Sequence, residues 1–493
     1  MRSFVGFNCI ASFGILLAAA CGDAESSAPA ECVENICPCS EGGIRAAIVE
    51  GGGPYSFDCD GPTTVVSRAE IVIDRDVTLD GGGNLTLDGN GRHRVFSVLE
   101  GTVVELVEFV VTNGREADEN GGGLRNEGTL TLTNSTVSGS SAGDDGGCRT
   151  DDINMLCVEG GGIWNAGTLT LMGSTVSGNL AHFGGGIANR GGSLTLVDST
   201  VISNSAQGCR GVGAVVCSGG GGIWNSGVLT IQGSSVSGSS ADWGAGIYNR
   251  GTPMLIDTNV FGNSAGFDGG GLLNFETLNL VDSTVADNEA GQSGGGIANE
   301  AGSLEVTSST LSGNTAASAG GGIFNPSGAG ADLVNTTVSA NSADTGGAIY
   351  SGGELQVSSS TMAGNDAPTA SAIYDPGTSN ALLRSITNTL IVGDCAGAPF
   401  DSGGHNIENP GNTCGFDEES DQPGAAQTNL GPLADNGGPT MTHALLEGSV
   451  AVDQIPAAAC LDRAGEPLTV DQRGEPRPAG ASDACDIGAF EAQ

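Results

Sequence analysis

The chain has 493 residues, and its 57 acidic and 16 basic side chains give it a net charge of -41 at pH 7. Every basic residue is arginine, and so negative a chain excludes nucleic acid and anionic membrane surfaces as natural partners. Its length exceeds one ordinary globular core but sets no limit on a solenoid, in which each turn contacts only its neighbours.

Residues 1–20 are apolar apart from Arg2 and a few small polar side chains, which predicts a secretory signal peptide. The segment LLAAAC that ends at Cys21 resembles a bacterial lipobox, with Ala18 where leucine is usual. That resemblance implies cleavage before Cys21 and lipidation of its thiol. We therefore expect an outer-membrane or cell-surface lipoprotein. Ordinary cleavage after Ala20, giving a secreted protein, is the alternative.

The cysteine count favours the lipid. Of 14 cysteines, Cys9 leaves with the signal and Cys21 takes the lipid, so 14 − 2 = 12 remain. An even number in an exported chain predicts disulfides. Proximity along the chain predicts four pairs, which are Cys148 with Cys157, Cys209 with Cys217, Cys395 with Cys414, and Cys460 with Cys485. The remaining cysteines pair among themselves in an order that the sequence leaves open, and these are Cys32, Cys37, Cys39 and Cys59.

Metal binding is the competing interpretation of these cysteines. Zinc-like spacing occurs only at Cys37 and Cys39, and no histidine lies near them. We therefore expect neither a metal nor a cofactor.

Residues 21–63 are predicted to form a polar tether and then a cap, with one helix at Ile44–Glu50. A β-solenoid ends in unpaired backbone groups and apolar side chains, and something must cover them. The cap resembles the CSLREA motif at the head of some bacterial surface β-helix proteins. The matching residues are Cys39, Ser40, Arg45, Ala46 and Ile48, with two glycines intervening.

A unit of about 24 residues, typified by GGGIANRGGSLTLVDSTVISNSA at Gly184–Ala206, recurs between Gly121 and Ala367. A fixed period of this size indicates a solenoid, because one unit cannot bury its apolar face alone. Apolar and small polar residues alternate within the unit, which is the period of strands. We predict an all-β, right-handed, pectin-lyase-like parallel β-helix over residues 64–378, with three strands per coil and about 12 coils.

Three columns of the repeat support stacked coils. Two columns consist mainly of asparagine, typified by Asn249 with Asn274 and by Asn263 with Asn288, and such amides can form ladders from coil to coil. Every copy also ends on alanine, which predicts an inward corner with room for one methyl group.

Two features mark a candidate binding face. Insertions after Ala142 and Ala206 fall at the same corner of the coil, and insertions into repeats often form the binding face; inert decoration is the alternative. In each repeat an aliphatic residue, such as Ile163, follows a glycine-rich turn, and the residue directly after that aliphatic is expected to point outward. Aromatic members of that column, a platform for sugar rings or a partner protein, are Trp164, Trp224, Tyr248, Phe324 and Tyr350. A satellite core beneath the inserted loops is the alternative.

Two further resemblances concern location. The GGxI motifs, such as Gly346–Ile349, resemble repeats of polymorphic outer-membrane proteins, and Phe261 with Asn263 comes nearest to the accompanying FxxN motif. Residues 379–493, with DQRGEPRP and CDIGAFE, resemble the choice-of-anchor Q domain of bacterial surface proteins. That resemblance implies a surface location and no reaction. We expect a C-terminal cap here, with Asp471 and Arg473 paired in a Pro-rich turn.

Catalysis is the rival hypothesis, since β-helices host polysaccharide lyases and glycoside hydrolases. The best carboxylate column is Asp198, Asp257 and Asp282, but other copies carry Asn, Gly or Ser there, which are turn formers. The chain has no lysine to act as a base, and its four histidines are scattered. The sequence therefore favours a non-enzymatic, lipid-anchored surface protein that acts in adhesion or binds a glycan or protein.

Overall fold

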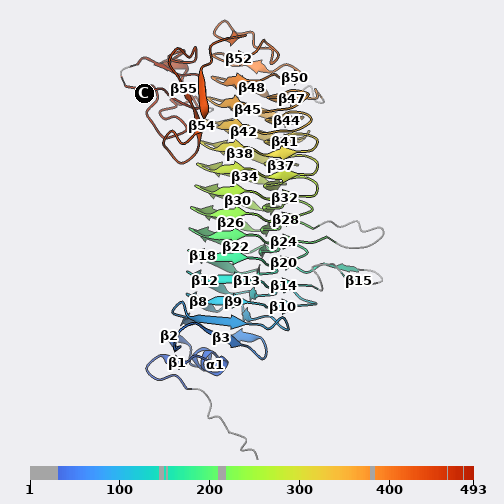
Figure 1. Cartoon of the computed structure of the whole chain (residues 1–493), viewed down its shortest axis with the longest axis vertical. Coiled ribbons are helices and arrows are strands. Elements are labelled where there is room, and N and C mark those ends of the chain that lie inside the picture. The colour runs from blue at the N-terminus through green and yellow to red at the C-terminus, as the bar shows by residue number, and fades with distance from the viewer. Residues whose placement is uncertain are drawn as a thin grey trace, which may run out of the picture.

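The computed structural model describes residues 31–143, 149–151, 154–208, 218–377, 383–462, 465–480 and 482–493. These residues wind into a tall parallel β-helix whose coils stack along the long axis of the molecule (Figure 1). Three long sheets of 15, 13 and 15 strands run its length, which corresponds to about 13 turns. The predicted fold is confirmed. The predicted signal peptide and Cys21 lie outside the described residues.

Each regular coil contributes a strand to four sheets, here called C, A, B and D in chain order. One coil consists of β17 (Ile163–Asn165), β18 (Thr168–Met172), β19 (Thr175–Ser177) and β20 (Leu180–Ala181). Sheet C runs from β4 (Ile71–Ile73) to β50 (Ala396–Gly397), and sheet A runs from β1 (Ile36–Pro38) to β51 (Asp401–Ser402). Sheet B runs from β3 (Thr63–Val66) to β53 (Gln422–Pro423), and the shorter sheet D runs from β10 (Arg115–Glu116) to β40 (Thr315–Ala316). Three strands per coil were predicted, and the fourth is too short to show alternation.

The register keeps equivalent residues of successive copies directly opposite one another. Asn249 faces Asn274, and Leu124 faces Ile163 even though the first insertion separates them. The insertions do not disturb this register because they leave the coil between sheet D and the next strand of sheet C.

Both asparagine columns form buried ladders. In the first, the Nδ2 of Asn249 donates to the Oδ1 of Asn274 at 2.8 Å, and the same bond links each member from Asn126 to Asn325 at 2.7–3.0 Å. In the second, the Oδ1 of Asn288 accepts from both the backbone N–H and the Nδ2 of Asn263, each at 3.0 Å. The interior therefore holds polar side chains whose hydrogen bonds are satisfied by neighbouring coils.

The core contains the inward side chains of sheets C, A and B, such as Ile163, Leu169 and Val176, which are fully buried. Most of the alanines that end the repeats are also buried. They pack in small clusters apart from this core, as Ala290 does with the equivalent alanines of the next two coils, Ala316 and Ala343. The alanines are kept apart from the core by the glycines that precede each strand of sheet C, such as Gly160–Gly162. A Cβ on Gly161 would collide with the carbonyl oxygen of Leu180, so sheet D packs directly against the glycine backbone.

The N-terminal end is covered by α1 (Glu41–Glu50), which starts three residues before the predicted helix. The side chain of Ser40 caps it by accepting from the N–H of Gly43 at 3.2 Å. Position 43 of this helix is a glycine because the Cβ of any other residue would collide with the carbonyl oxygen of Pro38. Two disulfides close this cap, joining Cys32 to Cys37 and Cys39 to Cys59.

The β-ladder continues beyond the predicted boundary at residue 378. It adds β48 (Arg384–Thr387), β49 (Leu390–Val392), β50, β51, β52 (Ile407–Asn409) and β53. Phe400 and Phe416 are buried in the central core at this end. The end of the solenoid is therefore closed by residues that still belong to its last coils.

The described residues of 430–493 lie beside the upper coils rather than over their end (Figure 1). We call this region the C-terminal clasp. It contains two antiparallel pairs, β54 (Leu430–Ala434) with β55 (Thr442–Leu445) and β56 (Ile455–Pro456) with β57 (Ala484–Cys485). Buried Gln472 joins the clasp to sheet B, donating from Nε2 to Thr310 Oγ1 at 2.9 Å and accepting from Thr337 Oγ1 at 2.6 Å.

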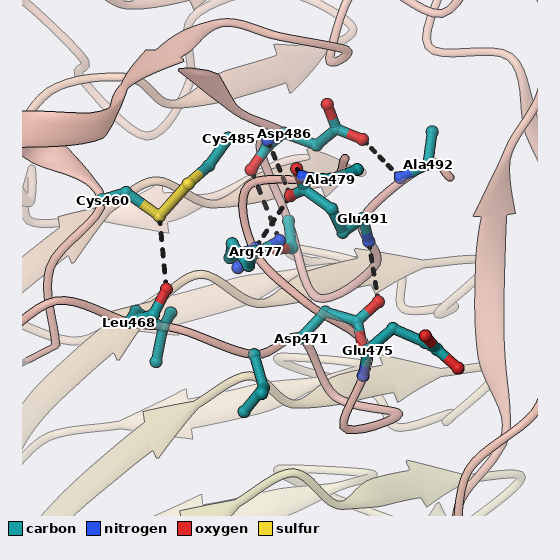
Figure 2. A network of polar contacts seen from close by, with 12 residues as sticks. Cys460, Leu468, Asp471, Glu475, Arg477, Ala479, Cys485, Asp486, Glu491 and Ala492 are labelled. Atoms are coloured by element: carbon teal, nitrogen blue, oxygen red, sulfur yellow. Dashed lines mark hydrogen bonds and ion pairs between the residues drawn. A yellow bond between two sulfur atoms is a disulfide. The ribbon is translucent and has the colours of Figure 1, made fainter. Parts of the chain in front are cut away.

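Ion pairs and disulfides hold the clasp together internally. Arg473 contacts Asp471 at 2.7 Å. The buried Arg477 contacts Glu491 at 2.9 Å (Figure 2). Cys460 is bonded to Cys485, and Cys395 to Cys414 in the last coils. These are two of the pairings predicted from chain proximity. No helix among the described residues is long and apolar enough to cross a membrane.

Candidate functional site

The outward column of sheet C divides into two aromatic groups. Trp164 and Tyr248 are half-buried on the outer surface, whereas Trp224 is only 6% exposed. Leu273 and Ala298 in the same column are fully buried, so they interrupt it. The strands that carry the column through both groups are β17, β21 (Ile187–Asn189), β25 (Ile223–Asn225), β29 (Ile247–Asn249), β33 (Leu272–Asn274), β37 (Ile297–Asn299), β41 (Ile323–Asn325), β44 (Ile349–Ser351) and β47 (Ile373–Asp375).

The first group is larger than the sequence predicted. Ring contacts join Phe183 to Trp224 at 6.2 Å and Trp243 to Phe267 at 5.0 Å between centroids. Tyr248 contacts a further ring, Phe275, at 5.5 Å. We call this surface the aromatic patch, and its members are Trp164, Phe183, Trp224, Trp243, Tyr248, Phe267 and Phe275. It holds all 3 tryptophans of the chain.

Four members of the patch were missed because they stand in turns rather than in the outward column. Phe183, Trp243 and Phe267 each lie two residues after the alanine that ends a repeat, and Phe275 follows the ladder asparagine. Their shared position was visible in the repeat alignment. What the alignment could not show is that this turn brings them beside sheet C.

Three arginines stack on the rings of the patch. The guanidinium carbon of Arg125 lies 5.3 Å from the Trp164 centroid, and that of Arg190 lies 5.0 Å from the Trp224 centroid. Arg250 lies 4.8 Å from the Phe275 centroid, and its Nε donates to the hydroxyl of Tyr248 at 3.1 Å. Such cation–π contacts hold a guanidinium in place while leaving its edge open to other partners.

The three arginines differ in how far they are neutralised. Arg125 contacts two carboxylates, Glu119 at 3.2 Å and Glu127 at 2.7 Å. Arg190 contacts Glu159 at 3.3 Å. Arg250 has no carboxylate partner among the residues that the structure describes, so it is the one uncompensated cation on this face.

A pocket of about 420 Å³ opens between these side chains. Glu159 at its edge is 6% exposed and accepts a hydrogen bond from Trp164 Nε1 at 3.3 Å. Burial raises the pKa of the Glu159 carboxyl, against the opposing effects of the Arg190 charge and the Trp164 bond. The pocket is lined by Cys157, Glu159, Phe183, Arg190, Trp224, Tyr248 and Arg250.

The pocket adjoins the first insertion, whose hairpin of β15 (Arg149–Asp151) and β16 (Asn154–Leu156) projects from the side of the solenoid (Figure 1). Cys157 is disulfide-bonded. Its predicted partner Cys148, and the predicted pair Cys209 with Cys217 in the second insertion, lie outside the described residues. The predicted corner and the aromatic column therefore meet at one place on the surface.

The second aromatic group is a continuous stack. Ring centroids are 5.0 Å apart from Phe324 to Tyr350 and 5.5 Å apart from Tyr350 to Tyr374. Two carboxyls lie at the C-terminal end of the aromatic patch: Asp268 directly follows Phe267, and Glu300 lies one coil further on. Burial raises the pKa of both, and the charge of Asp268 raises that of Glu300 further.

The carboxylate column considered for catalysis occupies turns. Asp198, Asp257 and Asp282 have φ values of 49°, 47° and 51°, in the left-handed region that Asn, Asp and Gly tolerate best. Gly173 occupies the same corner with φ of 58°. Turn geometry therefore explains this column without a reaction. Among the described residues, no three His, Cys, Asp or Glu side chains gather as a metal site.

A scan of protein-family models and a search of curated proteins found no match to this chain. A search of solved structures matched the crystal structure of a pectate lyase, Pel9A. The two chains share 12% sequence identity with a TM-score of 0.33, over 91% of this chain and 90% of the other. Similarity at that level carries no argument about the chemistry of this chain.

Proposed function

We propose that the protein is an exported, lipid-anchored surface β-helix that binds a glycan through its aromatic patch and does not cleave it. The observation that carries the proposal is the gathering of all 3 tryptophans with four other rings on one face. Half-exposed rings offer flat apolar surfaces to the C–H faces of sugars, and neighbouring charged groups can bond their hydroxyls.

The spacing of the patch favours a polysaccharide over a compact ligand. Neighbouring coils of a β-solenoid lie ~4.8 Å apart. This distance is close to the advance per sugar of an extended pyranose chain. Strands of sheet C carry Trp164, Trp224 and Tyr248, so little conformational entropy of these three rings is lost when a ligand binds.

Export and anchoring are the second part of the proposal. Disulfides persist mainly in oxidising compartments, and four of them join pairs of described cysteines, two in the N-terminal cap and two towards the C-terminus. We propose that lipid on Cys21 holds the N-terminal cap near the membrane and directs the solenoid away from it. Protease treatment of intact cells should remove the protein, and Cys21→Ala should move it from the membrane fraction to the medium or periplasm.

Binding is tested on a glycan array with the purified protein and two matched aromatic variants. Tyr248→Ala removes a half-buried ring from the patch, whereas Phe261→Ala removes an exposed ring from β31 (Asn259–Phe261) on sheet B. We expect Tyr248→Ala to weaken glycan binding about tenfold, the loss of roughly 1.4 kcal/mol, and Phe261→Ala to leave it unchanged.

Three results would contradict the proposal. Equal binding by the two variants would place the site elsewhere, and an array without signal would favour a protein partner. An ultraviolet assay for unsaturated uronate should show no product, and product from any uronate polymer would establish a lyase instead.

A further inference from the structure

We propose that the ligand of the aromatic patch is an acidic polysaccharide whose chain runs parallel to the solenoid axis, with acidic groups on Arg250 and Arg190. The inference rests on the proposed glycan binding and names its ligand class. Three arguments support it, from the placement of the arginines, the free edge of Arg250 and the spacing of the two side chains.

Arginine is scarce in the repeats and concentrated on this face. In a chain with 57 acidic and 16 basic residues, the arginines between residues 116 and 383 are Arg125, Arg149, Arg190, Arg210 and Arg250. Three of these five, Arg125, Arg190 and Arg250, stack on rings of the patch. Carboxylates pair with Arg125 and Arg190, so Arg250 supplies the uncompensated positive charge that makes this face complementary to an anionic ligand.

Arg250 has the geometry of an unoccupied anion-binding group. The side chain is exposed, and stacking on Phe275 together with the Nε bond to Tyr248 fixes its plane. Among the described residues, nothing accepts a hydrogen bond from its two terminal nitrogens. A guanidinium presents such an edge to a carboxylate or a sulfate through two parallel hydrogen bonds, and it is more weakly hydrated than an ammonium group.

Arg190 and Arg250 occupy the same position in repeats that are two coils apart. The backbone N–H of Arg190 bonds the carbonyl of Asn165, and that of Arg250 bonds the carbonyl of Asn225. With Ser226 on the intervening coil, the two arginines are separated by about 10 Å along the axis. If one coil matches one sugar, these arginines meet acidic groups on every second sugar of an extended chain.

The charges on either side indicate how far such a chain would extend. Towards the C-terminus, Asp268 and Glu300 would repel an acidic chain before it reached the Phe324 stack. Towards the N-terminus, Arg125 continues the row, although Glu119 and Glu127 partly neutralise it. Asp268 lies on the same coil as Phe275, so the ligand should cover the coils from Trp164 to Tyr248.

The test is calorimetric titration of the purified protein with three probes of matched length, which are oligogalacturonate, chondroitin sulfate oligosaccharide and neutral dextran. We expect the acidic probes to bind more tightly than dextran and to weaken as salt rises. Arg250→Gln should weaken the acidic probes at least tenfold, and Arg250→Lys should restore part of the loss. Arg92→Gln, which removes an exposed arginine in an early coil, is the matched control and should change nothing.

Each outcome separates this inference from the proposed function. Unchanged tryptophan fluorescence in Arg250→Gln verifies that the variant is folded. If dextran binds as tightly as the acidic probes and Arg250→Gln has no effect, acidity is wrong while glycan binding stands. If no probe binds and the glycan array is also silent, both fall. A stronger response to oligogalacturonate than to chondroitin sulfate assigns the ligand to polymers with a uronate on every sugar, and the reverse assigns it to polymers in which uronate alternates with a sulfated sugar.

Discussion

The asparagine ladder should make the interior of the solenoid unusually sensitive to the loss of one amide. Asn249 is 1% exposed and takes part in four hydrogen bonds. Its Nδ2 donates to Asn274 Oδ1 at 2.8 Å and to the carbonyl of Gly251 at 3.0 Å. Its Oδ1 accepts from Asn225 Nδ2 at 2.8 Å and from the N–H of Gly251 at 3.0 Å.

We expect Asn249→Ala to lower the free energy of unfolding of its coil by about 3 kcal/mol. The loss of four hydrogen bonds at roughly 1 kcal/mol each sets an upper limit of about 4 kcal/mol. The cost is smaller because both neighbours keep one other partner, Asn225 with the carbonyl of Gly227 and Asn274 with the N–H of Glu276.

The end of the ladder provides the matched control. Asn126 donates to Asn165 Oδ1 at 2.7 Å and to the carbonyl of Thr168 at 2.9 Å, but its own Oδ1 is buried without a partner. Asn126→Ala removes that unsatisfied acceptor, but it also takes away the donor to the buried Asn165 Oδ1, so the two effects offset and the loss of two bonds remains. We therefore expect it to cost about 2 kcal/mol, less than Asn249→Ala.

Hydrogen exchange measured by mass spectrometry is the appropriate assay, because each coil of a solenoid contributes its own stability and opens locally. Peptides that cover residues 247–265 should exchange roughly 100-fold faster in Asn249→Ala, whereas those around residue 126 should change less in Asn126→Ala. Equal effects of the two substitutions would refute the reasoning, because the cost would then not follow the number of ladder bonds.

Three further predictions concern the pocket, the clasp and the glycines. Burial raises the pKa of the Glu159 carboxyl, so this group takes up a proton at a higher pH than an exposed glutamate as the pH falls, which removes a negative charge from the pocket. Titration should then show tighter binding of acidic probes at the lower pH, and Glu159→Gln should bind them tightly without that pH dependence. Gln472→Leu should make the clasp more susceptible to limited proteolysis, whereas Gln454→Leu, at an exposed site, should not. Equal resistance of the two variants to the protease would contradict the role of the buried Gln472 amide. Gly161→Ala should lower the free energy of unfolding by about 3 kcal/mol or more. Gly330→Ala should cost little, because its Cβ would make only an ordinary contact of 3.9 Å with the Cβ of Glu354; similar melting temperatures would argue against the close approach of sheet D.

Much of the coil could be predicted from the sequence because each repeat bonds mainly to the copies directly before and after it. A column in the repeat alignment is therefore a column in space, and the pairing of Asn249 with Asn274 follows from their common position. Strand alternation likewise predicted which face of sheet C carries Trp164 and Tyr248. In this fold the pattern within one repeat therefore also predicts the contacts between residues of different repeats.

The candidate site was only partly predictable for the opposite reason. Strand alternation located Trp164 and Tyr248, but the contacts of Phe183 with Trp224 and of Arg190 with Glu159 depend on how a turn crosses from sheet D to sheet C. No periodicity within a strand reports on the path of that turn. The pocket thus became visible only when the turns of successive coils were placed side by side.

The amino-acid sequence by itself determined the period, the strands, the amide ladders and the outward aromatic column, because these depend on contacts between equivalent residues of adjacent repeats. Only the tertiary structure decided that sheet D closes onto the glycines, that the turn aromatics join the arginines, and that the clasp lies along the side of the solenoid. The last of these depends on bonds such as that from Gln472 to Ser309, which lie 163 residues apart and share no repeat.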